Sequence, residues 1–339
     1  MQGKTTSILQ AINNTKKKYN ILTFPTHESI QTLMAKTGHN FHLYQGKGIK
    51  TWDNKYRKLP DNHVLLSGEP TQIQPDLFYD FILSQNKAGQ YPVAKQLSDS
   101  WNCPLITLEH TLPPPNWSDD QTKGYTSSLK GDINVYISKY SVNKWFDSFD
   151  DPRTRVIIHG MDTEFWKPLE NGHNDGRVLT VANLYSERDW ALDFQLYKRV
   201  CIDRKMPINP VGDTPGLSKA AKDEFDLLSK YQNASVFFNT SKVSPIPLSC
   251  VEAASCACPI VSTNTCLLPD VFTNNHDGFF SNDEQYLKDK LDWVLTHPEE
   301  AKELGKNARK TVLEKFNINR FVDDWNKIFD EAYGSTHYA

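Results

Sequence analysis

Residues 244–263 hold the sequence pattern with the clearest chemistry, and they read SPIPLSCVEAASCACPIVST. Ser244 is an expected helix N-cap and Pro245 an expected first helical residue, because serine accepts from free amides and the fixed φ of proline suits a first turn. The free amides and positive dipole end of such a helix favour a phosphate group. Glu252 lies eight residues after Ser244. Its two carboxylate oxygens could accept both hydroxyls of a ribose diol, although a surface glutamate on an ordinary helix is the simpler alternative.

The elements before this segment alternate between apolar runs and helical stretches. The runs predicted as strands are 19–24, 41–44, 63–66, 78–83, 104–108 and 133–137, and stretches such as 28–37, 92–101 and 141–149 are predicted as helices. Strands that alternate with helices favour a mostly parallel sheet covered on both faces.

A second series follows the polar, two-glycine stretch 169–177, which together with 156–168 is the best candidate for an interdomain linker. The predicted strands of this series are 177–182, 207–211, 236–238 and 259–262. Its predicted helices are 189–204, 218–230, 249–257 and 283–296. A further helical stretch is predicted from 298 to about 333. The pattern predicts two doubly wound α/β domains with a cleft between them. Ligands of such sheets sit outside the carboxyl ends of the strands.

Composition excludes several other classes of protein. The chain has 339 residues, 38% hydrophobic and 23% charged, with 38 Lys+Arg against 41 Asp+Glu. This is an ordinary folded composition without the global basic field of a nucleic-acid or membrane binder. No run approaches the roughly 18 apolar residues of a membrane span, and the N-terminus lacks a secretory signal. Six cysteines are too sparse for a disulfide framework. We therefore expect a cytoplasmic protein (host cytoplasm if the chain is viral), without integral membrane association, whose printed sequence is the whole working chain.

Five segments together resemble the family 4 glycosyltransferases, and the resemblance covers roughly residues 105–330. Glu252-Ala253 followed by Pro259-Ile260-Val261 resembles the second half of the family's signature helix. The other matching segments are Leu108-Glu109-His110, DINVYIS at 132–138, HGMDTEFWKP at 159–168, and GKNAR at 305–309 with Phe316 and Trp325 after it.

The resemblance implies the GT-B fold, with two Rossmann-like domains facing a cleft. Residues 1–165 would form an acceptor-side domain, 166–318 a nucleotide-sugar domain, and 319–339 a helix that crosses back to the first domain. It also implies a retaining enzyme without a metal or other cofactor, whose co-substrate is a nucleotide-diphosphate sugar. We expect a UDP-sugar rather than a GDP-sugar, and an acceptor that is a glycan, a small molecule or DNA. The oligomeric state stays open.

By the same resemblance, Glu252 would hold the ribose of the donor. In VANLYSERDW, Asn183 stands where the family has a phosphate-binding arginine and Arg188 where it has a lysine. Arg188 would therefore hold the diphosphate, helped by the backbone from Ser244 through Pro245, Ile246 and Pro247 to Leu248. The alternative for Arg188 is a surface arginine at a helix start.

His110 is the remaining candidate for the chemistry, since its strand end would face the cleft. A neutral imidazole there could bond the transferring sugar or the acceptor hydroxyl. We therefore predict His110 and Arg188 as the catalytic pair. The alternative for His110 is a structural histidine tied to the backbone near the proline-rich turn.

The sequence also departs from the family. Ser244 replaces the first glutamate of the signature, Ala257 replaces a glycine, and Phe24-Pro25-Thr26-His27 stands where a Gly-rich loop is usual. These departures leave the sugar unidentified. They also keep open an alternative of another class, a nucleotide-binding or scaffolding protein without catalysis.

Residues 44–58 form a local basic patch with interleaved aromatics. Its cations are Lys47, Lys50, Lys55, Arg57 and Lys58, against a single Asp53, and its aromatics are Tyr44, Trp52 and Tyr56. Basic groups follow phosphates and aromatics stack on bases or sugar rings. The patch suggests a bacteriophage-type glycosyltransferase acting on a hydroxymethylated DNA base. The acceptor-side candidates are His27, Lys50, Trp52, Lys55 and Arg57; the alternative is a solvated loop whose aromatics pack inward.

Two other motifs carry no function. Gly3-Lys4-Thr5-Thr6 imitates the end of a P-loop, but only two residues precede it, so the strand and first glycine of that motif are missing. Cys250, Cys256, Cys258 and Cys266 do not have the spacing of a zinc site. Core packing is the expected role of these cysteines, and no metal site is predicted.

Overall fold

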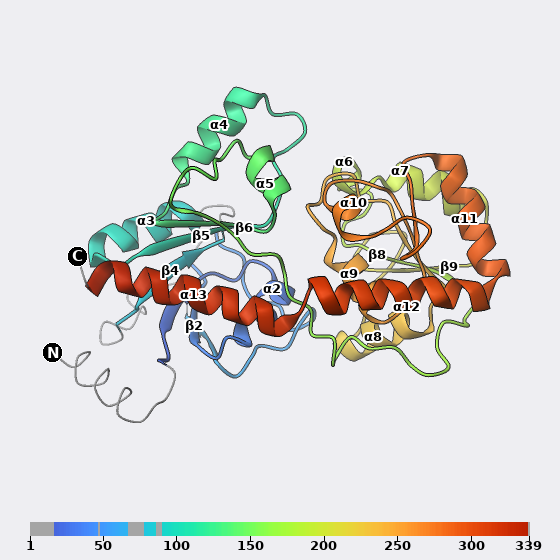
Figure 1. Cartoon of the computed structure of the whole chain (residues 1–339), viewed down its shortest axis with the longest axis horizontal. Coiled ribbons are helices and arrows are strands. Elements are labelled where there is room, and N and C mark those ends of the chain that lie inside the picture. The colour runs from blue at the N-terminus through green and yellow to red at the C-terminus, as the bar shows by residue number, and fades with distance from the viewer. Residues whose placement is uncertain (1–16, 47, 67–77, 86–89, 338–339) are drawn as a thin grey trace.

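The computed structural model describes residues 17–46, 48–66, 78–85 and 90–337. The P-loop imitation at 3–6 and Lys47 of the basic patch lie outside the described residues. Figure 1 shows two α/β domains side by side, each built around its own sheet.

The first domain contains a seven-stranded sheet in the order β3-β2-β1-β4-β5-β6-β7. All neighbouring strands are parallel. The strands are β1 (Asn20–Thr23), β2 (Asn40–Tyr44), β3 (His63–Leu66), β4 (Phe81–Ser84), β5 (Leu105–Glu109), β6 (Ile133–Tyr136) and β7 (Thr154–Val156). Its helices are α2 (Glu28–Ala35), α3 (Gln90–Trp101), α4 (Asp119–Ser128) and α5 (Lys139–Lys144). Nearly every residue of the central strands is buried, as expected for a sheet covered on both faces.

The second domain contains a five-stranded parallel sheet in the order β12-β11-β10-β8-β9. Its strands are β8 (Val178–Val181), β9 (Ile208–Val211), β10 (Val236–Asn239), β11 (Ile260–Ser262) and β12 (Phe279–Phe280). Its helices are α6 (Asp189–Leu192), α7 (Phe194–Tyr197), the π-helix η2 (Lys198–Ile202), α8 (Glu224–Asn233), α9 (Leu248–Ser255), α10 (Leu268–Val271), α11 (Glu284–Thr296) and α12 (Pro298–Lys315). The predicted class, two doubly wound α/β domains, is confirmed.

The predicted helix over 189–204 is wrong in detail. The backbone of Asp193 is left-handed, with φ 52°, and its side chain accepts from the amide of Leu196 to cap α7. Helix α6 therefore ends there, because a left-handed residue cannot continue an α-helix, and α7 and η2 follow without a break between them. Helix α8 likewise begins at Glu224 rather than 218, where Asp223 caps it by accepting from the amide of Asp226.

The polar stretch 169–177 does not span freely between the domains. His173 is buried against the second domain, where its ring nitrogens lie 3.1 Å and 3.0 Å from the carbonyl oxygens of Ala234 and Cys256. A Cβ added to Gly172 would lie 2.3 Å from the carbonyl oxygen of Gln232, so only glycine permits this approach. The chain passes between the domains earlier, over 157–168.

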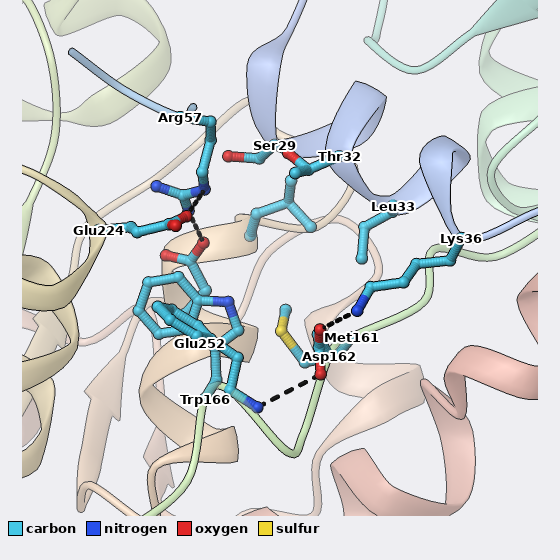
Figure 2. A pocket seen from close by; sticks show the side chains of 12 residues that line it. Ser29, Thr32, Leu33, Lys36, Arg57, Met161, Asp162, Trp166, Glu224 and Glu252 are labelled. Carbon is cyan, nitrogen blue, oxygen red and sulfur yellow. Dashed lines mark hydrogen bonds and ion pairs between the residues drawn. The ribbon is translucent and has the colours of Figure 1, made fainter. Parts of the chain in front are cut away.

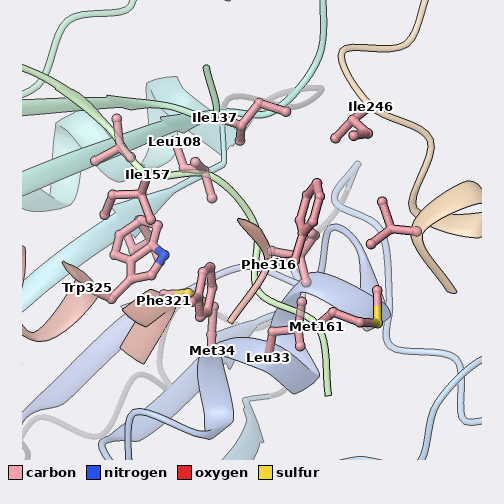
Figure 3. Close-up of a cluster of buried hydrophobic side chains, with 14 of the residues drawn as sticks. Leu33, Met34, Leu108, Ile137, Ile157, Met161, Ile246, Phe316, Phe321 and Trp325 are labelled. Atoms are coloured by element: carbon pink, nitrogen blue, oxygen red, sulfur yellow. The ribbon is translucent and has the colours of Figure 1, made fainter. Parts of the chain in front are cut away.

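The last helix, α13 (Ile318–His337), follows α12 almost end to end and lies along the first domain (Figure 1). Tyr19 donates to Asp330 at 2.6 Å, and a ring nitrogen of His39 lies 3.0 Å from the side-chain oxygen of Asn326. Figure 3 shows Trp325 and Phe321 of α13 packed among side chains of α2 and of the strand ends, such as Met34 and Leu108. This apolar cluster fixes α13 to the first domain.

Cys250, Cys256 and Cys258 are buried and unpaired, in agreement with the predicted core role, whereas Cys266, predicted with them, is only partly buried. Within the described part of the chain, no cluster of histidine, cysteine and carboxylate side chains is placed to hold a metal ion. None of the described helices has the length and apolar character needed to span a bilayer.

Candidate active site between the domains

A cavity of about 650 Å³ lies between the two sheets and is lined from both domains. The lining residues come mostly from loops that follow the carboxyl ends of β1, β5, β8 and β10. This is where doubly wound sheets bind ligands. The predicted residues that line the cavity are His27, Lys50, Arg57, His110, Asn183, Arg188, Glu252 and all five residues from Ser244 to Leu248. Trp52 and Lys55 are not among its lining residues.

Arg188 and Asn183 both lie in the loop after β8. The amide of Arg188 donates to the carbonyl of Leu184 at 2.9 Å, which orders the turn before α6. The side-chain oxygen of Asn183 accepts from the amide of Asp213 at 2.9 Å. Asn183 thus positions the neighbouring loop after β9, while the guanidinium of Arg188 is exposed to the cleft for an anion.

The prediction that Ser244 caps the signature helix is wrong. Helix α9 begins at Leu248, with Pro247 at the N-cap position, and Ser244 and Pro245 lie in the preceding loop. Pro247 disfavours a helical conformation at Ile246, so the helix cannot begin earlier. Both prolines also lack an amide hydrogen, so they cannot donate to a phosphate. The amides of Cys250 and Val251 donate to the Pro247 carbonyl. The first-turn amides of Leu248 and Ser249 remain as the donors for an anion.

Glu252 is buried in the middle of α9, with 6% of its surface exposed. Its Oε1 accepts from Arg57 Nη2 at 2.8 Å, and its Oε2 accepts from the hydroxyl of Tyr231 at 3.0 Å. Burial raises the pKa of Glu252, while the Arg57 charge and the two hydrogen bonds act in the opposite direction. Figure 2 shows Arg57 reaching from the first domain toward Glu252, with Glu224 beside it.

Figure 2 shows side chains that line a smaller cavity of about 220 Å³, among them Arg57 and Glu252. Both residues line both cavities. The lining of the smaller cavity also includes the Lys36–Asp162 ion pair and Trp166. The Arg57 guanidinium lies 5.1 Å from the Trp166 ring centroid, within the range of a cation–π contact.

Three histidines face the cleft from the first domain: His27, His110 and His159. The rings of His27 and His110 lie 6.1 Å apart, edge to face. The pKa of His27 is lowered to about 4, chiefly because the surrounding protein removes water from the ring. The negative charge of Glu28 raises this pKa, whereas the positive charges of Lys50, Arg57 and Arg188 lower it further. Burial lowers the pKa of His159 to about 3. These two side chains are therefore neutral at pH 7 and can exchange single hydrogen bonds with hydroxyls.

Residues 219–311 match the protein-family model described as glycosyl transferases group 1. This stretch of the second domain is therefore similar to the group 1 glycosyltransferases. The matched residues include Glu252 and all of α9, together with α8 and most of α12. The resemblance to GT-B glycosyltransferases that the sequence motifs indicated is thereby confirmed.

Comparisons over the longer chain agree with the group 1 match. Alpha-maltose-1-phosphate synthase of Mycolicibacterium smegmatis is 19% identical over 283 residues, which cover 68% of this chain and 73% of that protein. The solved structure of Anabaena HepE in complex with UDP and glucose superposes with a TM-score of 0.71 at 13% identity, covering 93% of this chain and 100% of that one. Sucrose-phosphate synthase of Thermosynechococcus elongatus gives a TM-score of 0.69 at 15% identity, covering 94% and 100%. Such distant structures establish the GT-B fold.

The basic patch of residues 44–58 is paired largely within the chain itself. Lys50 pairs with Glu28 at 2.5 Å, and Lys55 pairs with Asp213 at 2.7 Å. Trp52 is buried and its indole nitrogen donates to the carbonyl of Arg57 at 3.1 Å. Lys50, Lys55 and Arg57 thus pair with carboxylates of the same chain, and the Trp52 ring packs inward.

Sequence reasoning missed several residues of the candidate site. Tyr231 gives no signal in the sequence, because only the packing of α8 on α9 brings its hydroxyl to Glu252. Asp213 follows β9, so its strand-end position was a usable signal. Trp190, two residues after Arg188, lines the cleft with 52% of its surface exposed, and an aromatic beside a predicted phosphate ligand could have been noted.

Proposed function

We propose that this protein is a retaining, metal-independent glycosyltransferase that moves a sugar from a UDP-sugar to an acceptor hydroxyl. One observation carries the proposal: Arg188, the first turn of α9 and Glu252 line one cleft in the second domain, opposite His27 and His110 of the first. Proteins of similar fold support the choice of donor, since HepE is described in complex with UDP-glucose and with UDP and glucose.

Each of these groups has a distinct role in the proposed reaction. Glu252 accepts from the ribose hydroxyls, and the first-turn amides of Leu248 and Ser249 bind the diphosphate. The Arg188 guanidinium binds it as well. As the bond between sugar and diphosphate breaks, negative charge grows on the leaving phosphate. A fixed cation and a helix N-terminus inside a cleft stabilise that charge without a metal.

His110 lies across the cleft and would bond a hydroxyl of the sugar or of the acceptor. Retention of anomeric configuration is the outcome expected from the family resemblance. An NMR analysis of the first-formed product, read from the anomeric coupling constant, tests it. Activity that persists in excess EDTA tests the metal-independent mechanism.

The direct test of this function is turnover of UDP-sugars by the full chain, with release of UDP as the readout. We expect release from at least one UDP-sugar and its loss in Arg188→Ala and Glu252→Gln. Glu314→Ala, an exposed change on α12, is the matched control and should turn over normally. Binding of UDP without turnover of any sugar nucleotide would instead indicate the non-catalytic alternative.

A further inference from the structure

Residues 50–58, hereafter the clasp, connect the first domain to the donor site of the second. Three consecutive side chains of the clasp bond across the cleft. Lys55 and the Tyr56 hydroxyl donate to the same Oδ2 of Asp213, at 2.7 Å and 2.8 Å. Arg57 donates to Glu252 at 2.8 Å. The clasp thus holds both the loop after β9 and the middle of α9.

The clasp covers the carboxylate of Glu252, which under the proposed function binds the ribose of the donor. Arg57 and Glu252 are both buried, with 8% and 6% of their surface exposed. One oxygen of Glu252 bonds Arg57 and the other bonds Tyr231. A ribose diol needs access to both oxygens, and the Arg57 side chain stands in the approach from the cleft. The Arg57–Glu252 pair also lines both the 650 Å³ cleft and the 220 Å³ cavity.

Arg57 has a second carboxylate within reach. Its Nε lies 3.9 Å from Glu224, whose side chain is 27% exposed at the start of α8. A guanidinium that leaves Glu252 can therefore shift toward Glu224 and solvent without becoming a buried, unpaired charge. This second partner makes two positions of Arg57 physically accessible.

We propose that the clasp is an autoinhibitory contact, in which Arg57 occupies the ribose-binding carboxylate until a nucleotide displaces it. The inference rests on the proposed function, because it takes Glu252 as the ribose acceptor. Only chains with an open clasp bind nucleotide, so the apparent dissociation constant equals the intrinsic one divided by the open fraction. Weakening the clasp raises that fraction and tightens binding.

Calorimetric titration of UDP into clasp variants of the full chain tests this inference. Asp213→Asn removes the carboxylate shared by Lys55 and Tyr56 without changing Glu252, and Arg57→Ala removes the blocking side chain. If about one chain in ten is open at rest, both variants should bind UDP up to about tenfold more tightly than the wild type. Lys95→Ala, which removes an exposed pair with Asp99 of the same helix, is the control and should leave binding unchanged. Weaker binding by Arg57→Ala with no change in Asp213→Asn would overturn the clasp and make Arg57 a support for Glu252.

Hydrogen exchange separates failure of the clasp from failure of the proposed function. We expect UDP to slow amide exchange in residues 248–252 and to speed it in residues 50–58. Slower exchange in both segments would overturn the clasp while leaving the nucleotide site in place. Unchanged exchange in both segments would overturn the proposed function, and the clasp with it.

Discussion

Nη2 of Arg57 lies 2.8 Å from Oε1 of Glu252, although the two residues are 195 positions apart and belong to different domains. Each residue was a candidate from the sequence, but for opposite ends of the reaction: Arg57 for the acceptor and Glu252 for the donor. Their contact means that the donor site is built from both domains. It also makes the charge state of Glu252 depend on a residue of the first domain.

Replacing Glu252 should destabilise the protein. Glu252→Ala removes the partner of the Arg57 guanidinium and of the buried Tyr231 hydroxyl. Removing one member of a buried ion pair typically costs about 3–5 kcal/mol, and the nearby Glu224 should bring the loss toward the lower end of that range. Glu252→Gln keeps one acceptor oxygen for Arg57 and places an amide NH2 that can donate to the Tyr231 hydroxyl, so it should lose less. Urea unfolding measures the difference. The exposed control Glu314→Ala should lie within about 0.5 kcal/mol of the wild type. A Glu252→Ala protein as stable as that control would show that the pair is not formed in solution.

Arg188→Ala should abolish most turnover with little effect on folding. The side chain is exposed in the cleft, and loss of a group that stabilises transition-state charge typically lowers kcat about 10²–10³-fold. Arg188→Lys keeps the charge but cannot form the bidentate hydrogen bonds of a guanidinium, so its kcat should lie between those of the wild type and Arg188→Ala. Steady-state kinetics with the active UDP-sugar, together with a thermal melt of each variant, measure both effects. Equal kcat values in the three proteins would exclude Arg188 from the chemistry.

Acid should destabilise the protein through its buried histidines. Burial lowers the pKa of His159 in the folded state to about 3, from an ordinary value of 6.5. The unfolded chain therefore binds a proton that the folded chain does not, and stability falls as the pH falls from about 6.5 toward 3. The slope approaches about 1.4 kcal/mol per pH unit for each such group.

The pH effect can be assigned by substitution. Urea unfolding between pH 7 and pH 4 should give a shallower slope in His159→Gln than in the wild type. His276→Gln is the control, because the His276 side chain is 62% exposed. If both variants keep the wild-type slope, the pKa of His159 is the same in the folded and the unfolded protein, which contradicts the prediction.

The α13 helix should be essential for the stability of the first domain. Trp325 is 1% exposed in the cluster of Figure 3, and truncation of a buried tryptophan to alanine typically costs about 3–5 kcal/mol. Trp101→Ala, at a residue 42% exposed, is the control and should cost much less. Chemical denaturation followed by circular dichroism measures both. Similar losses in the two variants would argue against the packing of α13.

Most strands and the fold class could be predicted from the sequence, because short apolar runs that alternate with helical stretches indicate the buried strands of a parallel sheet. The prediction failed where one residue overrides a periodic pattern. The left-handed Asp193 divides the 189–204 helix, and Pro247 delays the start of α9. The prediction for the basic patch also failed. The number of cations in a segment does not show which carboxylates of the other domain will form ion pairs with them. The contact between Arg57 and Glu252 is of this kind, because only the relative placement of the two sheets creates it.

The binding of UDP to the wild-type chain and to Glu252→Gln tests the central claim most directly. Isothermal titration should show a single site in the wild type and at least tenfold weaker binding in the variant, since the amide gives up one of the two charged acceptors for ribose. GDP, ADP and CMP should bind more weakly than UDP. Equal affinities of the two proteins for UDP, or no binding of any nucleotide to the wild type, would contradict the assignment of this cleft as a nucleotide-sugar site.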